Sequence, residues 1–153
     1  KGQIVSFLAR EYDLLVRVGG PNAGHKVFGD PPYTHHQLPS GTRYNTEARL
    51  LIGPGAVLNV DKLLVEIGDC GVDAGRLVID RRAMVIAARD IRAERKLVRD
   101  IGSTGSGTGA ATARRIMGRH SGTKLAGDEP RLRPYLGDAF RVLEDAYLNG
   151  QRV

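Results

Sequence analysis

The sequence has no tryptophan and only one cysteine, Cys70, among its 153 residues. A single cysteine excludes an intrachain disulfide framework and the paired-cysteine motif of structural zinc sites. We therefore expect the protein to work in the reducing cytoplasm. No apolar run approaches the roughly 20 residues of a membrane-spanning helix, and no signal-peptide pattern opens the chain. We expect no membrane partner.

Aromatic side chains are also scarce, at 5% of the residues. Proteins that hold single-stranded nucleic acid stack its bases on aromatic rings, so this scarcity argues against such a partner. The formal net charge of +6 nevertheless favours an anionic ligand, and the basic excess is concentrated between Arg76 and Arg119. A basic nucleic-acid-binding module therefore stays as an alternative to a nucleotide-binding protein.

Apolar runs alternate with helical patterns along the chain. Nearly continuous apolar runs at 13–18, 49–53 and 76–80 are typical of strands buried in a parallel sheet. Asn59 is a good N-cap for a helix that ends at Gly68 or Gly71. Further helices are expected at 2–10, in the second part of 83–100, at 110–118 and at 135–150, with a loop at 120–134. This alternation predicts an α/β fold with a mostly parallel sheet flanked by helices.

The first and last helices have apolar faces. In the first helix the face contains Ile4, Val5, Phe7 and Leu8. The last helix is amphipathic, and it is expected to turn its larger apolar side chains into the core. Those side chains are Phe140, Leu143, Tyr147 and Leu148.

Two glycine-rich loops interrupt the pattern, GGPNAGH at 19–25 and IGSTGSGTG at 101–109. Loops that follow parallel strands gather at the carboxyl ends of the strands, where ligands bind. The second loop adds the hydroxyls of Ser103, Thr104 and neighbouring residues, and the helix after it offers N–H groups to an anion. The loop therefore has the chemistry of a phosphate cradle, although it lacks the Walker A pattern and a flexible Gly/Ser linker has a similar composition.

The first glycine loop contains two side chains with binding chemistry. Asn22 offers both a donor and an acceptor, and His25 can give a proton or hold a phosphate oxygen. The alternative is a structural turn with a histidine on its surface.

Four motifs occur in an order that resembles the adenylosuccinate synthetase family: VRVGGPNAGHKVF, LPSG, LLIGPGAVLN and IGSTGSGTG. KGQIV at the start also looks like the end of that family's phosphate loop. The resemblance covers nearly the whole chain and is strongest over 1–119. It implies one P-loop-NTPase-like α/β nucleotide-binding domain over 1–153. This domain would be a segment of a longer enzyme, incomplete at both ends.

The resemblance implies a ligase that joins IMP to L-aspartate with GTP and Mg²⁺, through a 6-phosphoryl intermediate, in a cytoplasmic homodimer. The chain departs from the family pattern at positions such as Gln3 and Ser106. In these departures it resembles the compact archaeal branch of the family. That branch is close to the phage 2-aminoadenylosuccinate synthetases, which use dGMP and ATP. The phage-type reaction and an inactive fragment therefore stay as alternatives.

The resemblance also assigns roles in the first glycine loop and the second. His25 matches the family's general acid, and Gly24 matches the residue whose carbonyl binds Mg²⁺. Asn22 and Thr104 match contacts to the IMP phosphate, and Ser103 belongs to the same nucleotide-binding group.

The resemblance assigns further roles to residues near the two ends of the region 1–119. Lys1 and Gly2 match contacts of the phosphate loop to GTP. In the family an arginine after the second glycine loop crosses the dimer interface to reach IMP. Arg119 is the best match for it, with Arg115 as the alternative.

Two other features receive simpler interpretations. His35 and His36 are adjacent, but no carboxylate or cysteine follows them at metal-ligand spacing, so a solvated pair on a strand is favoured over a metal site. Cys70 is interpreted as a small residue at a helix end.

Overall fold

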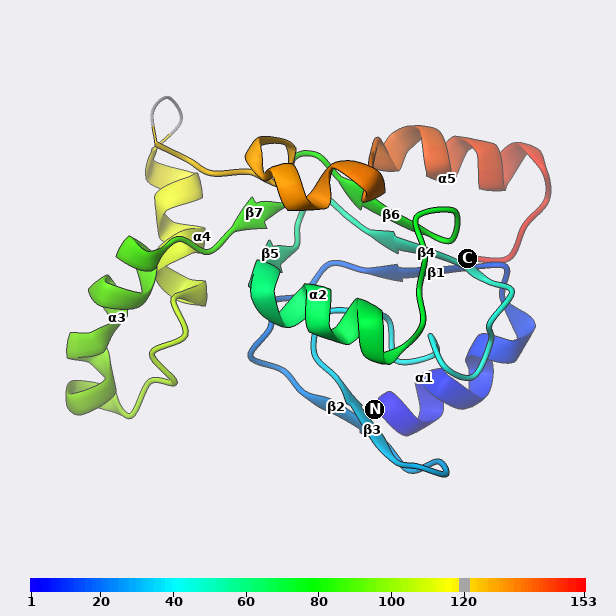
Figure 1. Ribbon diagram of the computed structural model, residues 1–153, viewed down its shortest axis with the longest axis horizontal. Helices are drawn as coiled ribbons and strands as arrows, with labels where there is room; N and C mark the ends of the chain where they lie inside the picture. The colour runs from blue at the N-terminus through cyan, green and yellow to red at the C-terminus, as the bar shows by residue number, and fades with distance from the viewer. Residues whose placement is uncertain (119–121) are drawn as a thin grey trace.

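The computed structural model describes residues 1–118 and 122–153, and it has a parallel sheet at its centre (Figure 1). Within these residues the sheet has the order β1-β4-β6-β8, and every neighbouring pair is parallel. The strands are β1 (Leu14–Arg17), β4 (Arg49–Ile52), β6 (Leu77–Asp80) and β8 (Leu136–Gly137). The expectation of a mostly parallel sheet is confirmed.

Two smaller strand pairs accompany the central sheet. β2 (His25–Val27) and β3 (Tyr33–His35) form an antiparallel hairpin. β5 (Val57–Leu58) and β7 (Met84–Val85) pair in parallel. Because β2 begins at His25, the hairpin starts where the first glycine loop ends.

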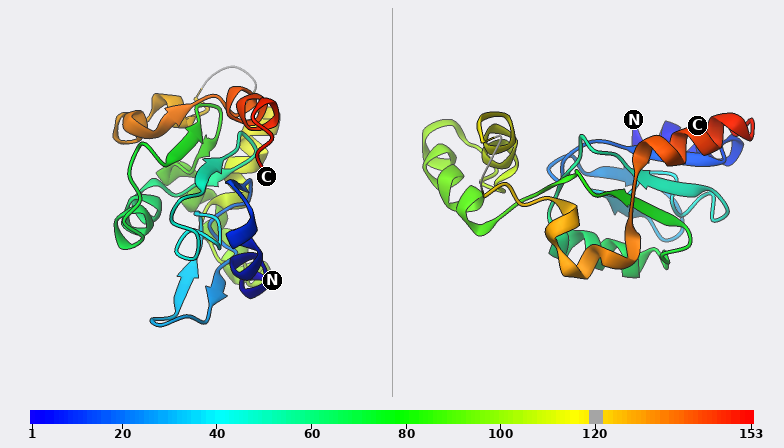
Figure 2. Two further views of the ribbon diagram at one scale, coloured as in Figure 1. Left: turned by 90° about the vertical axis from the view of Figure 1, so that its right-hand side faces the viewer. Right: turned by 90° about the horizontal axis from the view of Figure 1, so that it is seen from above.

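Helices lie on both faces of the sheet, and α3 and α4 lie together beyond the carboxyl ends of its strands (Figures 1 and 2). The α-helices are α1 (Gly2–Leu8), α2 (Val60–Asp69), α3 (Ala88–Ile101), α4 (Thr108–Met117) and α5 (Ala139–Leu148). The 3₁₀ helices are η1 (Ala9–Glu11), η2 (Ala126–Asp128) and η3 (Pro130–Tyr135). Among the described residues, no helix combines the length and apolar character that crossing a membrane requires.

Most helix predictions hold, with shifted ends, but the helix expected at 135–150 begins only at Ala139, and Leu136–Gly137 form β8 instead. The segment 83–100 contains β7 followed by α3, as expected. The helix expected at 110–118 begins earlier, at Thr108. The described part of 120–134, which was expected to be a loop, contains η2 and most of η3.

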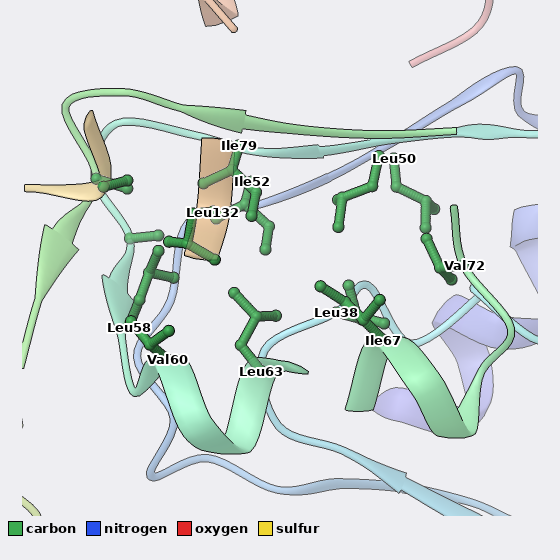
Figure 3. Packing of buried hydrophobic residues seen from close by; sticks show 14 of the residues in the cluster. Leu38, Leu50, Ile52, Leu58, Val60, Leu63, Ile67, Val72, Ile79 and Leu132 are labelled. Atoms are coloured by element: carbon green, nitrogen blue, oxygen red, sulfur yellow. The ribbon is translucent and has the colours of Figure 1, made fainter. Parts of the chain in front are cut away.

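The larger core lies between α2 and one face of the sheet (Figure 3). Leu63 and Ile67 of α2 pack with Leu50 and Ile79 of the strands, and all four side chains are buried. Fully burying a side chain of this size contributes roughly 1.5–3 kcal/mol. The helix begins as predicted, because the Asn59 side chain accepts a hydrogen bond from Lys62 N at 3.1 Å.

The opposite face of the sheet receives α5, but not through the side chains that the sequence suggested. Ala139, Val142 and Ala146 are buried against Leu14 and Leu51. The larger side chains of α5 point away from the sheet and are exposed, so the prediction for them is wrong. They are Phe140, Leu143, Tyr147 and Leu148.

Asp80 determines which face of α5 meets the sheet. Its carboxylate is fully buried at the end of β6 and accepts a hydrogen bond from Ala139 N at 2.8 Å. It also accepts bonds from the backbone N, Nε and Nη2 of Arg82 at 2.7–2.9 Å. Because Ala139 is fixed at this point, the small residues one and two turns later face the sheet.

The buried face of α1 and of the turn after it also consists of small residues. Gly2, Ser6 and Ala9 are buried, whereas Ile4 and Phe7 of the apolar face are exposed. A Cβ added to Gly41 would lie 2.2 Å from the Ala9 Cβ. Small side chains at these positions therefore let the helix approach its neighbours closely.

We expect Asp80→Asn to lower the free energy of unfolding by about 2–3 kcal/mol, because one amide oxygen cannot replace the buried carboxylate. The hydrogen bonds from Arg82 hold the pKa of Asp80 at about 2. The stability from this carboxylate is therefore complete above its unfolded pKa of about 3.9 and is lost as the pH falls towards 2.

Denaturant unfolding between pH 7 and pH 2 measures this difference, and Asp145→Asn on the exposed face of α5 is the matched control. A difference between Asp80→Asn and the parent protein that stays constant down to pH 2 would contradict the assignment.

Candidate active site

The two glycine-rich loops meet through Asn22. Its Nδ2 donates to Thr104 Oγ1 at 3.2 Å, although the two residues are 82 positions apart in the sequence. Its Oδ1 accepts hydrogen bonds from Ser106 Oγ at 2.5 Å and Thr108 Oγ1 at 3.1 Å. One amide therefore joins the loop after β1 to the loop before α4.

The hydroxyls of the second loop form a continuous row. Thr104 Oγ1 and Ser106 Oγ lie 3.2 Å apart, and Ser106 Oγ lies 3.2 Å from Thr108 Oγ1. Hydroxyl groups rotate to donate or accept, so this row and the Asn22 amide can present several donors to phosphate oxygens. Ser103 has a different position in the loop, because its Oγ accepts from Gly105 N at 3.3 Å.

The N-terminus of α4 already holds a carboxylate. Glu94 of α3 is buried, and it accepts hydrogen bonds from Gly107 N at 2.6 Å and Ala110 N at 2.8 Å. The expectation that this helix end offers its N–H groups to an anionic ligand is therefore wrong for these two donors. The donors that the loop presents to a ligand come from its side chains instead.

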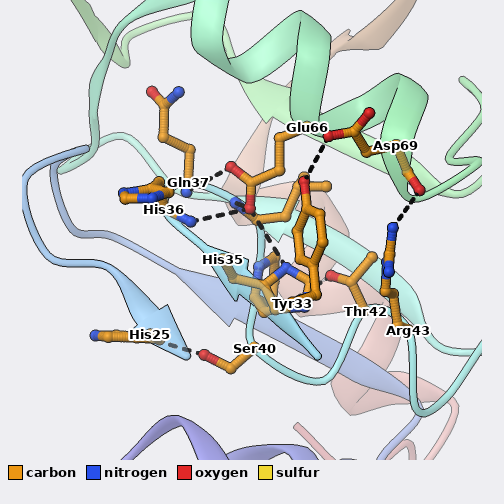
Figure 4. A network of polar contacts seen from close by, with 12 residues as sticks. His25, Tyr33, His35, His36, Gln37, Ser40, Thr42, Arg43, Glu66 and Asp69 are labelled. Atoms are coloured by element: carbon orange, nitrogen blue, oxygen red, sulfur yellow. Dashed lines mark hydrogen bonds and ion pairs between the residues drawn. The ribbon is translucent and has the colours of Figure 1, made fainter. Parts of the chain in front are cut away.

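His25 lies at the start of β2 and is held on its Nδ1 side. Arg17 Nη1 lies 2.8 Å from His25 Nδ1. Ser40 Oγ lies 3.1 Å from the same atom (Figure 4). Partial burial lowers the pKa of His25, and the charges of Arg17 and Lys1 lower it further. A pKa below the ordinary value favours the neutral form of the ring.

The first residues of α1 pack beside His25. A Cβ added to Gly2 would lie 2.9 Å from the His25 Cβ and 3.3 Å from Lys26 O, so this position has no room for a larger residue. Lys1 is close enough for its charge to act on the His25 ring. The structure therefore brings together three of the predicted site residues, Lys1, Gly2 and His25.

Gly24 is packed as tightly on the other side of the loop. A Cβ at this position would lie 3.0 Å from both His36 Cε1 and Thr34 Cγ2. His36 Nδ1 in turn lies 3.2 Å from Pro21 O. The chain of the first glycine loop is thus held directly against β3 and the residue that follows it.

Glu66 anchors the segment that carries Ser40 (Figure 4). Its buried carboxylate accepts hydrogen bonds from His36 N at 3.0 Å, Gln37 N at 2.9 Å and Leu38 N at 3.2 Å. A carboxylate bonded to three consecutive N–H groups fixes the course of the backbone. The sequence does not reveal this role, because nothing in the helical pattern distinguishes Glu66 from an exposed residue of α2.

The adjacent histidines do not form the solvated pair that the sequence suggested. His35 is fully buried, and its Nδ1 lies 3.3 Å from Glu66 Oε1. His36 is half-buried beside Gly24. No group of three His, Cys, Asp or Glu residues that could hold a metal ion occurs in the described ranges 1–118 and 122–153.

Two arginines are candidates for the contact across a dimer interface, and the structure describes only one of them. Arg119 lies outside the described residues. Arg115 Nη1 donates to Pro54 O at 2.5 Å, so this guanidinium is already bound within its own chain.

Comparison with known proteins identifies the family. The family model for adenylosuccinate synthetase matches residues 1–153. The chain belongs to the adenylosuccinate synthetase family. The adenylosuccinate synthetase of Methanocaldococcus jannaschii is 34% identical, over 100% of this chain and 46% of that protein. The Thermococcus onnurineus enzyme is 37% identical, over 100% of this chain and 47% of that protein. The chain thus spans about half the length of these relatives.

Solved structures of the family have the same fold. Succinoaminodeoxyadenylate synthetase of cyanophage S-2L, bound to dGMP and dATP, has a TM-score of 0.81 and 28% identity over 99% of this chain and 45% of that one. Fully ligated adenylosuccinate synthetase from Plasmodium falciparum has a TM-score of 0.86 over 100% of this chain and 47% of that one, at 22% identity. These structures confirm the α/β fold.

We expect Glu94→Gln to lower the free energy of unfolding by about 1–3 kcal/mol. Each carboxylate oxygen of Glu94 accepts one backbone N–H bond, whereas glutamine has a single amide oxygen and loses one of these two acceptors. Glu144→Gln makes the same chemical change at an exposed position of α5. Thermal or denaturant unfolding of both variants tests this role. Equal stabilities would show that Glu94 does not anchor the second glycine loop.

Proposed function

We propose that the enzyme containing this chain joins IMP to L-aspartate with hydrolysis of GTP, giving adenylosuccinate. Membership of the family and the archaeal relatives support this reaction. The observation that carries it is the contact between Asn22 and Thr104, because it gathers the two glycine-rich loops into one polar surface.

The proposed reaction has two steps. First, the purine N1 gives up its proton to a base, the γ-phosphoryl group moves from the bridging oxygen of GTP to the purine 6-oxygen, and GDP leaves. The aspartate amine then attacks C6, the bond from C6 to this oxygen breaks, and inorganic phosphate leaves. A 6-oxo group leaves poorly by itself, so phosphorylation makes the second step feasible. Charge on the transferring phosphoryl group must be met by donors that are already in place.

The described residues supply such donors in two groups. In this proposal Asn22 and Thr104, with the neighbouring Ser103, bind the phosphate of the nucleoside monophosphate. Lys1 and Gly2 contact the phosphates of GTP, beside His25. His25 is the catalytic residue, and it stabilises the negative charge that develops on the 6-oxygen during transfer.

Mg²⁺ fits this chain as an ion shared with the nucleotide. No group of three His, Cys, Asp or Glu side chains that could hold a metal ion occurs among the described residues. Mg²⁺ commonly takes most of its oxygen ligands from phosphates and water. The Gly24 carbonyl is the ligand that we propose from this chain, as the resemblance implies, and the loop around it is packed against His36 and Thr34. Bound there, the ion would supply positive charge to the phosphates.

The phage-type reaction is the second candidate. The synthetase of cyanophage S-2L was solved with dGMP and dATP, and its similarity extends over almost the whole of this chain. A ligase that joins dGMP to L-aspartate with ATP would use the same loops and the same two steps. The difference lies in recognition of the base and of the phosphoryl donor.

We also propose that the enzyme is a cytoplasmic homodimer, as the resemblance implies. Arg119 is then the residue that reaches the nucleotide bound by the partner. The bond from Arg115 to Pro54 O favours Arg119 over Arg115 for this contact, since Arg115 is already engaged.

Substrate pairs distinguish the two ligase reactions. We expect aspartate-dependent product from IMP with GTP, at a kcat/KM about 10-fold or more above that with dGMP and ATP, because a site built to bind one base edge rejects another. Reactions without aspartate are the control. A preference for dGMP with ATP would establish the phage-type reaction, and absence of product from either pair would refute the ligase proposal.

We expect Asn22→Ala to raise the KM for the nucleoside monophosphate by roughly 10- to 100-fold, because a hydrogen bond to a charged group contributes about 1.5–3 kcal/mol. Steady-state kinetics measure this effect, and Asn149→Ala at the exposed end of α5 is the matched control. A normal KM in the Asn22 variant would remove this residue from phosphate binding.

A further inference from the structure

Arg17 occupies a central position under the first glycine loop. It is the last residue of β1, and only 9% of its surface is exposed. Its Nη1 lies 2.8 Å from His25 Nδ1, and its Nη2 donates to Ala23 O at 3.2 Å and His36 O at 2.6 Å. One guanidinium therefore connects β1, the glycine loop, β2 and the segment before Ser40.

The chemistry of these groups determines which ring nitrogen carries the proton. A guanidinium has five N–H donors and no acceptor. A contact of 2.8 Å between Arg17 Nη1 and His25 Nδ1 is therefore a hydrogen bond only if Nδ1 accepts it. In a neutral imidazole the other nitrogen, Nε2, then carries the hydrogen.

We propose that Arg17 is a positioning residue that keeps His25 as the neutral Nε2–H tautomer and aims that N–H at the ligand. The part of this inference that concerns catalysis rests on the proposed function. His25 then acts as a neutral hydrogen-bond donor to the phosphoryl or 6-oxygen atoms. A neutral histidine that polarises an oxygen is known from other enzymes.

Protonation of His25 conflicts with this arrangement. A second proton would have to sit on Nδ1 and point at the Arg17 guanidinium. The groups that oppose a positive charge on the ring from the surrounding elements are Arg17 of β1, the side chain and α-amino group of Lys1 before α1, and the titratable ring of His35 of β3. Burial of the ring acts in the same direction.

Ser40 completes the contacts at this nitrogen. Its Oγ lies 3.1 Å from His25 Nδ1, and a hydroxyl can donate to an accepting nitrogen. The segment that carries Ser40 is held at His36 by the carboxylate of Glu66 and by Arg17. Both neighbours of Nδ1 are therefore held by contacts within the chain.

The tautomer can be measured directly by NMR of the full enzyme labelled with ¹⁵N-histidine, with His25→Gln to assign the His25 signals. We expect a single Nε2–H tautomer for His25 and a pKa below the ordinary value. Arg17→Met should give a mixture of the two tautomers and a higher pKa for His25. An Nδ1–H tautomer in the unmodified enzyme would overturn the proposal, whether or not the Arg17 variant folds.

Arg43→Met is the matched control, because Arg43 stacks on Tyr33 with its guanidinium carbon 3.9 Å from the ring centroid and donates to Asp69 O. It should leave the tautomer of His25 unchanged. Arg17→Lys keeps a charge but not the planar fork, so it should restore the tautomer only in part. A single Nε2–H tautomer in folded Arg17→Met would also overturn the proposal.

Kinetics separate this inference from the proposed function. In the full enzyme, Arg17→Met should lower kcat about 10- to 100-fold with a smaller change in KM, and it should move the acidic limb of the pH profile of kcat to higher pH. If the NMR result holds and kcat is unchanged, Arg17 positions His25 but the proposed catalytic role of His25 fails.

Discussion

The carboxylate of Glu66 accepts hydrogen bonds from three consecutive backbone N–H groups, and the candidate active site depends on this contact. A buried carboxylate must have hydrogen-bond partners, since leaving such a charge unpaired costs several kcal/mol. Here the partners belong to the segment that leads to Ser40. That segment also supplies His36 O to Arg17, so both neighbours of His25 Nδ1 depend on the position of the same stretch of backbone.

Two other buried carboxylates fix backbone in the same way. Glu94 holds the turn that leads into α4, and Asp80 holds the first residue of α5. Glycine-rich segments lose more conformational entropy on folding than other segments do, so they need such anchors to have one conformation. The carboxylate of Glu94 also changes the chemistry of the site. It occupies helix N–H groups, so the phosphate-binding character of the second loop comes from the row of hydroxyls around Asn22.

The described residues therefore offer two kinds of donor to an anionic ligand. The first kind is the cluster of Asn22 and the loop hydroxyls, which joins segments that are distant in the sequence. The second is His25, held from behind by Arg17 and packed against Gly2. Both arrangements suit phosphoryl transfer, which relies on positioning and on stabilisation of charge. They also agree with membership of the adenylosuccinate synthetase family.

The sequence by itself determined three of the four strands of the central sheet, the N-cap at Asn59, the two glycine-rich loops and the family, because apolar runs, caps and ordered motifs are local patterns. It could not determine which stripe of α5 is buried, since Ala139, Val142 and Ala146 have the same helical spacing as Phe140, Leu143 and Tyr147. Only the tertiary structure decided this, through the bond from Ala139 N to Asp80. It likewise decided that Glu94 occupies the start of α4 and that Arg17 meets His25. Each of these contacts joins residues that chain folding brings together, and no local pattern encodes a distance between separate segments.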